Sequence, residues 1–183
     1  MLHTNKQPLL VIYEKGFYYC LSCDQKLKIK KGENYMSIQT FKASSQLKEN
    51  YLVENTARQH RVLVDEPAAL GGTDKAINPV ELLLAALGSC QSIVARTYAE
   101  KFDIDLIDFK VELEGDINLD GFFDKADVRP GYSDIRATYF INTSASDEKV
   151  EEFLKFLEAH CPVGDTIENT VNFNSSFQIS QKA

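Results

Sequence analysis

The sequence predicts an α+β fold in which an antiparallel sheet packs around one long central helix. Strand-like patterns are grouped near the start and again in the second half of the chain, and helical patterns are segregated from them rather than alternating with them. Between the two groups lies a long apolar run that begins with strong helix-start signals at Asn78. The 183 residues, 44% hydrophobic and 26% charged, are typical of a globular protein with one principal domain.

Charge and composition exclude several classes of function. A net charge of −7 and a pI near 5.0 argue against a nucleic-acid-binding protein, which needs a basic surface. No unbroken apolar run approaches the roughly 20 residues that span a bilayer, and residues 9–13 are too short for a secretory signal core. Four cysteines are too few for a disulfide-rich secreted domain. We therefore expect a soluble, cytoplasmic protein that binds neither nucleic acid nor membranes.

Residues 1–35 differ in charge from the rest of the chain. They contain six Lys and three acidic residues, whereas the following residues contain 14 basic and 24 acidic ones, so net charges of +3 and −10 add to −7. Cys20 and Cys23 form a C-x-x-C pair, which is either half of a zinc site or a redox pair. The next cysteine is Cys90 and no matched second pair follows, so we expect no metal site.

A second interpretation of this extension is that it is a translated leader. Residues 30–33, Lys-Lys-Gly-Glu, can be encoded by a string that contains GGAG, which is typical of a bacterial ribosome-binding site, shortly before the Met36 codon. On this hypothesis translation starts at Met36, and residues 36–183 form the single functional domain. The nucleotide sequence of the gene tests it, because a purine-rich run must precede codon 36.

Three short strands are expected first, at residues 38–43, 51–54 and 60–65. Residues 71–74, Gly-Gly-Thr-Asp, precede the long helix but lack the Lys and the Ser or Thr of a phosphate-binding loop, so we expect a turn there. Pairs of polar turn residues separate the strands, which favours an antiparallel meander; these pairs are Ser44–Ser45 and Asn55–Thr56.

The long helix has a well-defined beginning. Asn78 is a good N-cap, Pro79 suits the first helical position, and Glu81 completes a capping box. The residues that follow, up to Val94, are apolar on almost every side, which predicts a helix buried in the centre of a fold. Continued to about Lys101, this helix would be roughly 33 Å long. Such a helix is long for this domain, and a dimer that wraps two of them together would cover it.

The second half of the chain predicts two strands, two helices and a final strand. Residues 107–114 alternate strictly between apolar and polar, and residues 135–141 place every second apolar residue on one face. An amphipathic helix begins after Ser146, and Pro162 begins another. We expect the last strand at residues 171–179, with four apolar side chains on it: Val171, Phe173, Phe177 and Ile179.

Two cysteines are the candidate chemical groups. Cys90 lies in the middle of the expected long helix, and Cys161 precedes Pro162 at the start of a later one. Unpaired backbone N–H groups at a helix start favour a thiolate, so Cys161 is a candidate for activation. Free cysteines are also among the most buried residue types, so packing is the alternative role for each. The residue types alone leave both roles open.

The segment from Asp65 to Cys90 resembles the OsmC family, which includes osmotically inducible protein C and the organic hydroperoxide resistance proteins. The similarity rests on residues 65–67, on residues 71–74 and on the run from Asn78 to Cys90. It continues at residues 128–132 and 161–167, and so covers roughly residues 36–183. The resemblance implies an intertwined homodimer with an α+β fold and the long helices at its centre.

The resemblance also implies a thiol peroxidase, active in the bacterial response to oxidative stress. In such enzymes the cysteine of the central helix, here Cys90, attacks the peroxide O–O bond and becomes a sulfenic acid. The second cysteine, here Cys161, condenses with it to a disulfide, which an external dithiol, often lipoyl-linked, then reduces. The apolar residues around Cys90 favour organic hydroperoxides over hydrogen peroxide. No cofactor or metal is implied.

The chain departs from the hydroperoxidase pattern at two positions. The family carries a Glu directly after the Asn-Pro pair, where this chain has Val; Glu81 is one position later and would face away from Cys90, so capping is its favoured role. The family also carries an activating Arg on its N-terminal strands. Arg61 is the nearest candidate, although solvated surface charge is its favoured interpretation, and Arg96 points elsewhere on the helix.

Two classes of function therefore remain open. The first is a cysteine-based hydroperoxide reductase that uses Cys90 and Cys161. The second is a dimeric OsmC-like protein without efficient peroxidase activity, whose hydrophobic cleft binds an apolar small molecule. A cysteine hydrolase that uses His160 is disfavoured, because adjacency in sequence does not align a base with a thiol. The resolving position of Cys161 favours the first class, and the missing Glu and unassigned Arg favour the second.

Overall fold

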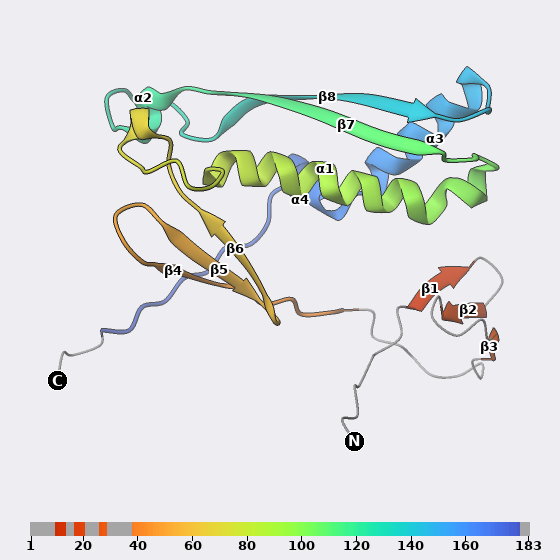
Figure 1. The fold of residues 1–183 in the computed structure, drawn as a ribbon, viewed down its shortest axis with the longest axis horizontal. Coiled ribbons are helices and arrows are strands. Elements are labelled where there is room, and N and C mark those ends of the chain that lie inside the picture. Colours follow the sequence, from red (N-terminus) through yellow and green to blue (C-terminus); the bar gives the residue numbers. More distant parts are fainter. Residues whose placement is uncertain (1–9, 14–16, 21–25, 29–37, 180–183) are drawn as a thin grey trace. The chain divides into compact units, whose positions relative to one another are not determined.

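The structure, a computed structural model, describes residues 10–13, 17–20, 26–28 and 38–179 (Figure 1). The chain divides into two compact units, Met1–Phe41 and Lys42–Ala183. Three short strands of the first unit form an antiparallel sheet in the order β1-β2-β3; they are β1 (Leu10–Tyr13), β2 (Phe17–Cys20) and β3 (Lys26–Lys28). The expectations for Cys23 and for a start at Met36 lie outside the described residues.

The second unit begins with an antiparallel meander, as the sequence predicts, but its first two strands lie at other positions in the sequence than expected. Its strands are β4 (Ser44–Leu47), β5 (Val53–Ala57) and β6 (His60–Val64), in that order. The prediction of a first strand at residues 38–43 was wrong, and so was that of turns at residues 44–45 and 55–56. These polar pairs face each other across β4 and β5, where the hydroxyls of Ser44 and Thr56 lie 2.7 Å apart. Cross-strand hydrogen bonds of this kind stabilise a strand pair.

The loop after β6 is a turn organised around Asp65, which confirms the structural interpretation of residues 71–74. The Asp65 side chain is buried and accepts hydrogen bonds from the Thr73 hydroxyl and from three backbone N–H groups, those of Glu66, Thr73 and Lys75. The Thr73 hydroxyl, foremost, lowers the pKa of Asp65. The loop includes the 3-10 turn η1 (Ala68–Leu70). A Cβ at Gly72 would lie 1.8 Å from the Glu66 carbonyl oxygen, so the loop requires a glycine there.

The long helix α1 (Pro79–Tyr98) begins as the sequence predicts and continues into the 3-10 segment η2 (Ala99–Phe102). The Asn78 side chain accepts from the Glu81 N–H and the Glu81 carboxylate accepts from the Asn78 N–H, each at 2.8 Å. Gly88 allows α1 to approach the next strand closely, since a Cβ there would lie 3.1 Å from the Leu113 side chain.

One helical stretch in the described part of the chain, Pro79–Phe102, is long and apolar enough to span a membrane, with a mean hydropathy of 1.2. The sequence contains no unbroken apolar run of that length, because Ser89, Gln91 and Ser92 interrupt this one. A core helix of a globular fold meets the same criterion. Here the stretch packs on a sheet and on a second helix.

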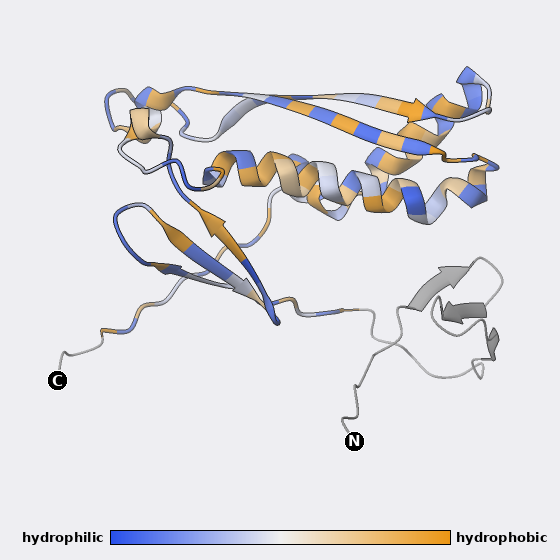
Figure 2. Ribbon diagram, viewed as in Figure 1, coloured by the Kyte–Doolittle hydropathy of each residue, from blue (hydrophilic) through white to orange (hydrophobic). Residues whose placement is uncertain are grey.

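The sheet beside α1 is a long hairpin of β7 (Asp108–Ile117) and β8 (Tyr132–Asn142). The short helix α2 (Leu119–Phe122) lies in the connection between them. Burial alternates along β7, with Phe109, Val111 and Leu113 on the inner face, which confirms the predicted alternation. Hydrophobic and hydrophilic residues alternate along this strand in Figure 2. One face of the hairpin is thereby available to α1.

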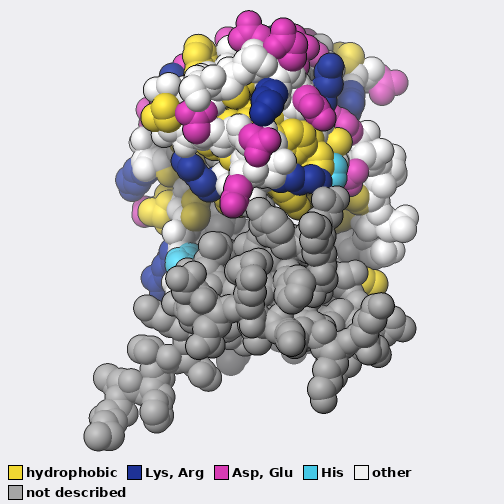
Figure 3. Space-filling model, turned by 90° about the vertical axis from the view of Figure 1, so that its right-hand side faces the viewer, with side chains coloured by type: hydrophobic (Ala, Val, Ile, Leu, Met, Phe, Trp, Pro, Cys, Tyr) yellow, Lys and Arg dark blue, Asp and Glu magenta, His cyan; other side chains and the backbone are white. Residues whose placement is uncertain are grey.

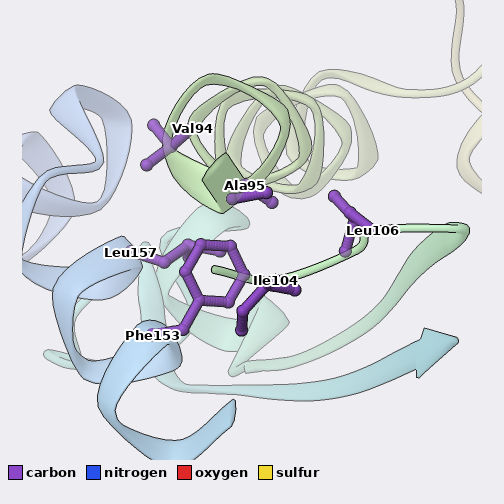
Figure 4. Packing of buried hydrophobic residues seen from close by; sticks show 7 residues of the cluster. Val94, Ala95, Ile104, Leu106, Phe153 and Leu157 are labelled. Atoms are coloured by element: carbon purple, nitrogen blue, oxygen red, sulfur yellow. The ribbon is translucent and has the colours of Figure 1, made fainter. Parts of the chain in front are cut away.

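The helices α3 (Asp147–Ala159) and α4 (Pro162–Glu168) follow β8 and begin at Ser146 and Cys161, as the sequence predicts. Phe153 and Leu157 of α3 are fully buried. They pack against the second half of α1 and the segment that leads into β7 (Figure 4). The complete cluster is Val94, Ala95, Ala99, Ile104, Leu106, Phe153 and Leu157. On the face shown in Figure 3, charged side chains of both signs are mixed with exposed hydrophobic ones.

The chain after α4 departs from the prediction. Residues 169–179 contain no strand, and their four alternating apolar side chains are exposed, with Phe173 at 88%. A strand requires a neighbouring strand to hydrogen-bond with, and none of the described strands pairs with this segment. The predicted α+β class with a long helix is confirmed. The prediction of a final strand at residues 171–179 was wrong for the described chain.

Candidate active site

The fold brings Cys90 and Cys161, far apart in the sequence, into contact. Cys90 lies in the middle of α1 and is partly exposed, while Cys161 is the N-cap of α4 and only 1% exposed. Packing of α4 against α1 joins them, and a hydrogen bond links the two thiols. Both are free thiols in this structure. The two thiols are therefore neighbours in the folded chain, as the cysteines of a disulfide-forming pair must be.

Burial and the helix start act in opposite directions on Cys161. The Gly164 N–H donates to its Sγ at 3.4 Å, an interaction that stabilises a thiolate. Burial has the larger effect and raises the pKa of the Cys161 thiol, and the neighbouring Cys90 raises this pKa further. The helix start therefore favours the Cys161 thiolate, as the sequence predicts, but burial outweighs it, so the pKa of this thiol lies above its ordinary value.

Cys161 lines a cavity of about 770 Å³ between α1, the β7–β8 hairpin, α3 and α4. Much of its wall is apolar, with Val80, Leu83 and Leu87 contributed by α1. Arg129 is the one basic residue among the described residues that line it. The cavity can accommodate a small organic molecule with its apolar part on α1.

A chain of hydrogen bonds lies in the same cavity. The Gln91 side chain, only 6% exposed, donates through Nε2 to the Tyr139 hydroxyl at 2.8 Å. The Tyr139 hydroxyl donates to Glu158 Oε1 at 3.3 Å. Burial, together with the charge of Glu158, raises the pKa of Tyr139. Gln91 Oε1 is buried and has no hydrogen-bond partner among the described residues.

Only a weak signal in the sequence points to these three residues. Tyr139 was placed on the apolar face of its strand, which the structure confirms, but its hydroxyl was given no partner. Gln91 is a polar residue next to Cys90 in an otherwise apolar stretch, and this could have marked it. Glu158 lies on the polar side of an amphipathic helix, where nothing distinguishes it from its neighbours.

The two other candidate site residues are engaged elsewhere. The Glu81 carboxylate forms the capping box of α1, the role that the sequence favoured. Arg61 lies on β6, its side chain 74% exposed, with Nη1 3.6 Å from Glu54 Oε2. Neither residue is among those that line the cavity. The structure therefore brings together the two cysteines but not Glu81 or Arg61.

Two further residues near the cysteines in sequence also have other partners. Arg96 donates from Nη1 to the Leu106 carbonyl oxygen at 3.1 Å. The His160 ring stacks on Phe156 with centroids 3.7 Å apart, and its Nδ1 lies 2.8 Å from the Phe156 carbonyl oxygen. His160 is thus held against its own helix, which gives a cysteine–histidine hydrolase no support.

An α+β fold with a long central helix and a thiol on it facing a second thiol defines an OsmC-like protein. The family model described as OsmC-like protein matches residues 72–176, and the chain belongs to this family. A hydroperoxide reductase of Mycoplasma genitalium is 26% identical over 109 residues, which are 58% of this chain and 72% of that protein.

Solved structures share the fold. An OsmC-like protein from Mycoplasma pneumoniae superposes with a TM-score of 0.64 at 21% identity, over 71% of this chain and 88% of the other. An organic hydroperoxide resistance protein OsmC from Legionella pneumophila superposes with a TM-score of 0.56 at 22% identity, over 72% and 90%. At these identities the likeness concerns the fold alone.

Proposed function

We propose that this chain is a cysteine-based peroxidase that reduces organic hydroperoxides through Cys90 and Cys161. The observation that carries the proposal is the contact between these two thiols, one of which lines a largely apolar cavity. A relative named hydroperoxide reductase supports the same chemistry. A homodimer, an external dithiol reductant of the lipoyl type and a cytoplasmic location belong to the same proposal.

In the proposed cycle Cys90 is the attacking thiol. Its thiolate attacks one peroxide oxygen, the O–O bond breaks, and the alcohol leaves while Cys90 becomes a sulfenic acid. Cys161 then attacks the Cys90 sulfur, a disulfide forms, and water leaves. The roles follow from burial, because Cys161 is protonated and nearly inaccessible, whereas Cys90 is partly exposed. The external dithiol returns both cysteines to the thiol form.

The apolar wall supports a preference for organic hydroperoxides. The wall includes Leu83 and Leu87 of α1 and Leu113 and Ile135 of the hairpin. An alkyl or aryl group gains roughly 25 cal/mol for each Å² of apolar surface that it buries there. Hydrogen peroxide has no such group, so we expect a higher kcat/KM for cumene hydroperoxide.

The test uses the wild type, Cys90→Ser and Cys161→Ser with cumene hydroperoxide, and sulfenic acid is trapped and located by mass spectrometry. The proposal requires sulfenate on Cys90 in the Cys161→Ser protein and no peroxide consumption by Cys90→Ser. Sulfenate on Cys161 in the Cys90→Ser protein would reverse the roles of the two thiols. Absence of oxidation at both thiols would contradict a peroxidase.

A second candidate function is a dimeric protein that binds an apolar small molecule with little peroxidase activity. The observation in its favour is that Glu81 and Arg61, the residues nearest to the activating pair of the family, have other partners. This alternative predicts that an apolar fluorescent probe binds the cavity equally well in the wild type and in Cys90→Ser, while neither protein consumes peroxide.

A further inference from the structure

We propose that Glu158, acting through the Tyr139 hydroxyl, takes the proton of the Cys161 thiol during disulfide formation and returns it to the oxygen that leaves Cys90. Gln91 is the positioning residue that holds the Tyr139 hydroxyl between them. This inference rests on the proposed peroxidase function and concerns its second step.

The geometry of the cavity supports such a relay. Tyr139 Oη accepts from Gln91 Nε2 at 2.8 Å and donates to Glu158 Oε1 at 3.3 Å. Cys161 lies beside this pair, because its backbone N–H donates to the Glu158 carbonyl oxygen at 3.3 Å and its side chain lines the same cavity as Tyr139. The four side chains come from α1, β8, α3 and the start of α4, and all line one cavity.

Disulfide formation needs a base at this place. Cys161 must attack as a thiolate, but burial keeps its thiol protonated at neutral pH. Cys161 is 1% exposed, so bulk water has little access to its proton. The carboxylate of Glu158, an exposed residue, can accept that proton through the Tyr139 hydroxyl, so the buried thiol itself need not reach water. His160 does not compete for this role, because its ring stacks on Phe156.

The atoms and electrons of the step balance. The Cys161 S–H proton passes to Tyr139 Oη as the hydroxyl proton of Tyr139 passes to Glu158. The Cys161 sulfur then bonds to the Cys90 sulfur, whose S–O bond breaks, and the departing hydroxide takes the proton back and leaves as water. The oxidation state of the Cys161 sulfur rises by one, from thiol to disulfide, and that of the Cys90 sulfur falls by one, from sulfenic acid to disulfide, so the electrons balance between the two sulfurs. No further oxidant or reductant is needed.

The unpaired oxygen of Gln91 fits both protonation states of this relay. With Glu158 ionised, Tyr139 donates to Glu158 and accepts from the Gln91 amide nitrogen. With Glu158 protonated, the carboxylic acid becomes a donor and Tyr139 must donate elsewhere. A half-turn of the Gln91 amide would present Oε1, which has no partner in the described structure, to the Tyr139 hydroxyl. A carboxamide is suited to this exchange, whereas an apolar residue offers neither partner.

The charged surroundings of Glu158 come from several elements. Tyr139 faces it from β8, and the two cysteines lie on α1 and at the start of α4. The other ionisable side chains that line the cavity in the described structure are Arg129, Tyr132, Asp134 and Glu168. A test of the relay must therefore compare pH profiles between variants rather than assign one wild-type pKa to Glu158.

The test separates the two steps of the reaction in the full-length protein. Cumene hydroperoxide is added in a single-turnover experiment, and the formation of the Cys90–Cys161 disulfide is followed by quenching with an alkylating reagent and mass spectrometry. Sulfenate formation is measured separately in the Cys161→Ser background. The variants are Glu158→Gln, Tyr139→Phe and Gln91→Met, and Glu151→Gln, an exposed carboxylate on the same helix, is the control.

We expect Glu158→Gln and Tyr139→Phe to slow disulfide formation about 100-fold, at the lower end of typical general acid–base contributions. Gln91→Met should slow it less, and Glu151→Gln should not change it. Disulfide formation in Glu158→Gln should also accelerate roughly tenfold per pH unit between pH 6 and 9, because solvent base replaces the relay. A purely structural role would not introduce this pH dependence.

The outcomes distinguish the relay from the peroxidase itself. The relay is supported if two results are obtained together. Adding Glu158→Gln to the Cys161→Ser protein leaves the rate of sulfenate formation unchanged, and Glu158→Gln by itself slows disulfide formation. Equal disulfide formation in Glu158→Gln and the wild type, at every pH, overturns the relay and leaves the peroxidase intact. Absence of sulfenate in Cys161→Ser overturns both.

Discussion

At the scale of single residues, Cys161 shows that two local rules can oppose each other. The sequence places it at a helix start, which favours a thiolate, and the structure confirms the N–H donor at Gly164. Burial nevertheless raises the pKa of this thiol. Burial depends on residues from distant segments, so the local pattern could identify the cap but not the protonation state.

The candidate site could be predicted only in part, because it too depends on residues from distant segments of the chain. The positions of the two cysteines in the sequence marked them as candidates, the family resemblance implied their roles, and the contact between them is present in the structure. Gln91 and Tyr139 are 48 positions apart, and Tyr139 and Glu158 are 19 apart. No spacing rule connects residues on a helix, a strand and a second helix, so this chain of hydrogen bonds could not be derived before the fold was known.

A prediction at this scale concerns Asp105, at the corner before β7. Its carboxylate accepts from the hydroxyls of Thr143 and Ser144 and from the Ser144 N–H. The Thr143 hydroxyl, foremost, lowers the pKa of Asp105 to about 2. Because the folded pKa lies below the unfolded value of about 3.9, this carboxylate stabilises the fold above that value and loses the effect as the pH falls towards 2.

We therefore expect Asp105→Asn to lower the free energy of unfolding at pH 7, and the difference from the wild type to shrink as the pH falls from 4 to 2. Urea denaturation at pH 7, 4 and 2.5 measures this, with Asp108→Asn, an exposed position on β7, as the control. A difference that is independent of pH would show that the ionised carboxylate is not the cause.

At the scale of the elements, the helices were predicted better than the strands. The signals for α1, α3 and α4 are local, because each helix satisfies its own backbone hydrogen bonds and its cap lies within three residues. The strands β4 and β5 were displaced, since polar residues expected in turns pair across them. A strand depends on its neighbour, and its register cannot be taken from its own residues alone.

The capping box of α1 carries the prediction at this scale. Asn78 and Glu81 each satisfy a backbone N–H of the other at 2.8 Å. Asn78→Ala removes the side-chain acceptor at the N-cap, and we expect it to lower the free energy of unfolding by about 1 kcal/mol. Urea denaturation at a fixed protein concentration measures this, since oligomerisation makes stability concentration-dependent.

Glu151→Ala, at an exposed position on α3, is the control for this loss and should change the free energy of unfolding little. If Asn78→Ala were as stable as this control, α1 would not depend on its cap. The capping role assigned to Glu81 would then lose its support.

At the scale of the whole molecule, the apolar surface of the described monomer is larger than its own core can cover. Ile93 of α1 is 67% exposed, and Leu83 on the same helix is 41% exposed. After α4, alternating apolar side chains are also open to solvent, Phe173 and Phe177 among them. Extended apolar exposure on a folded protein marks an interaction surface, and obligate homodimer interfaces resemble a core divided in two.

A homodimer would explain both departures from the sequence prediction. The long helix was expected to be buried on nearly all sides, and residues 171–179 were expected to form a strand. A second copy could cover the exposed side of α1 and offer the residues after α4 a strand to pair with. The alternating apolar residues at 171–179, which form no strand in the described chain, would then pair with a strand of the other subunit.

We therefore expect sedimentation at micromolar concentration to give a mass of twice 20.6 kDa. Ile93→Lys places a charge on the exposed side of α1, and it should shift the protein towards the monomer because an unpaired buried charge is costly. Glu151→Lys, on the exposed side of α3, is the control and should leave the mass unchanged. A wild-type protein that sediments as a stable monomer would exclude the dimer, and the apolar side of α1 would then require a different partner.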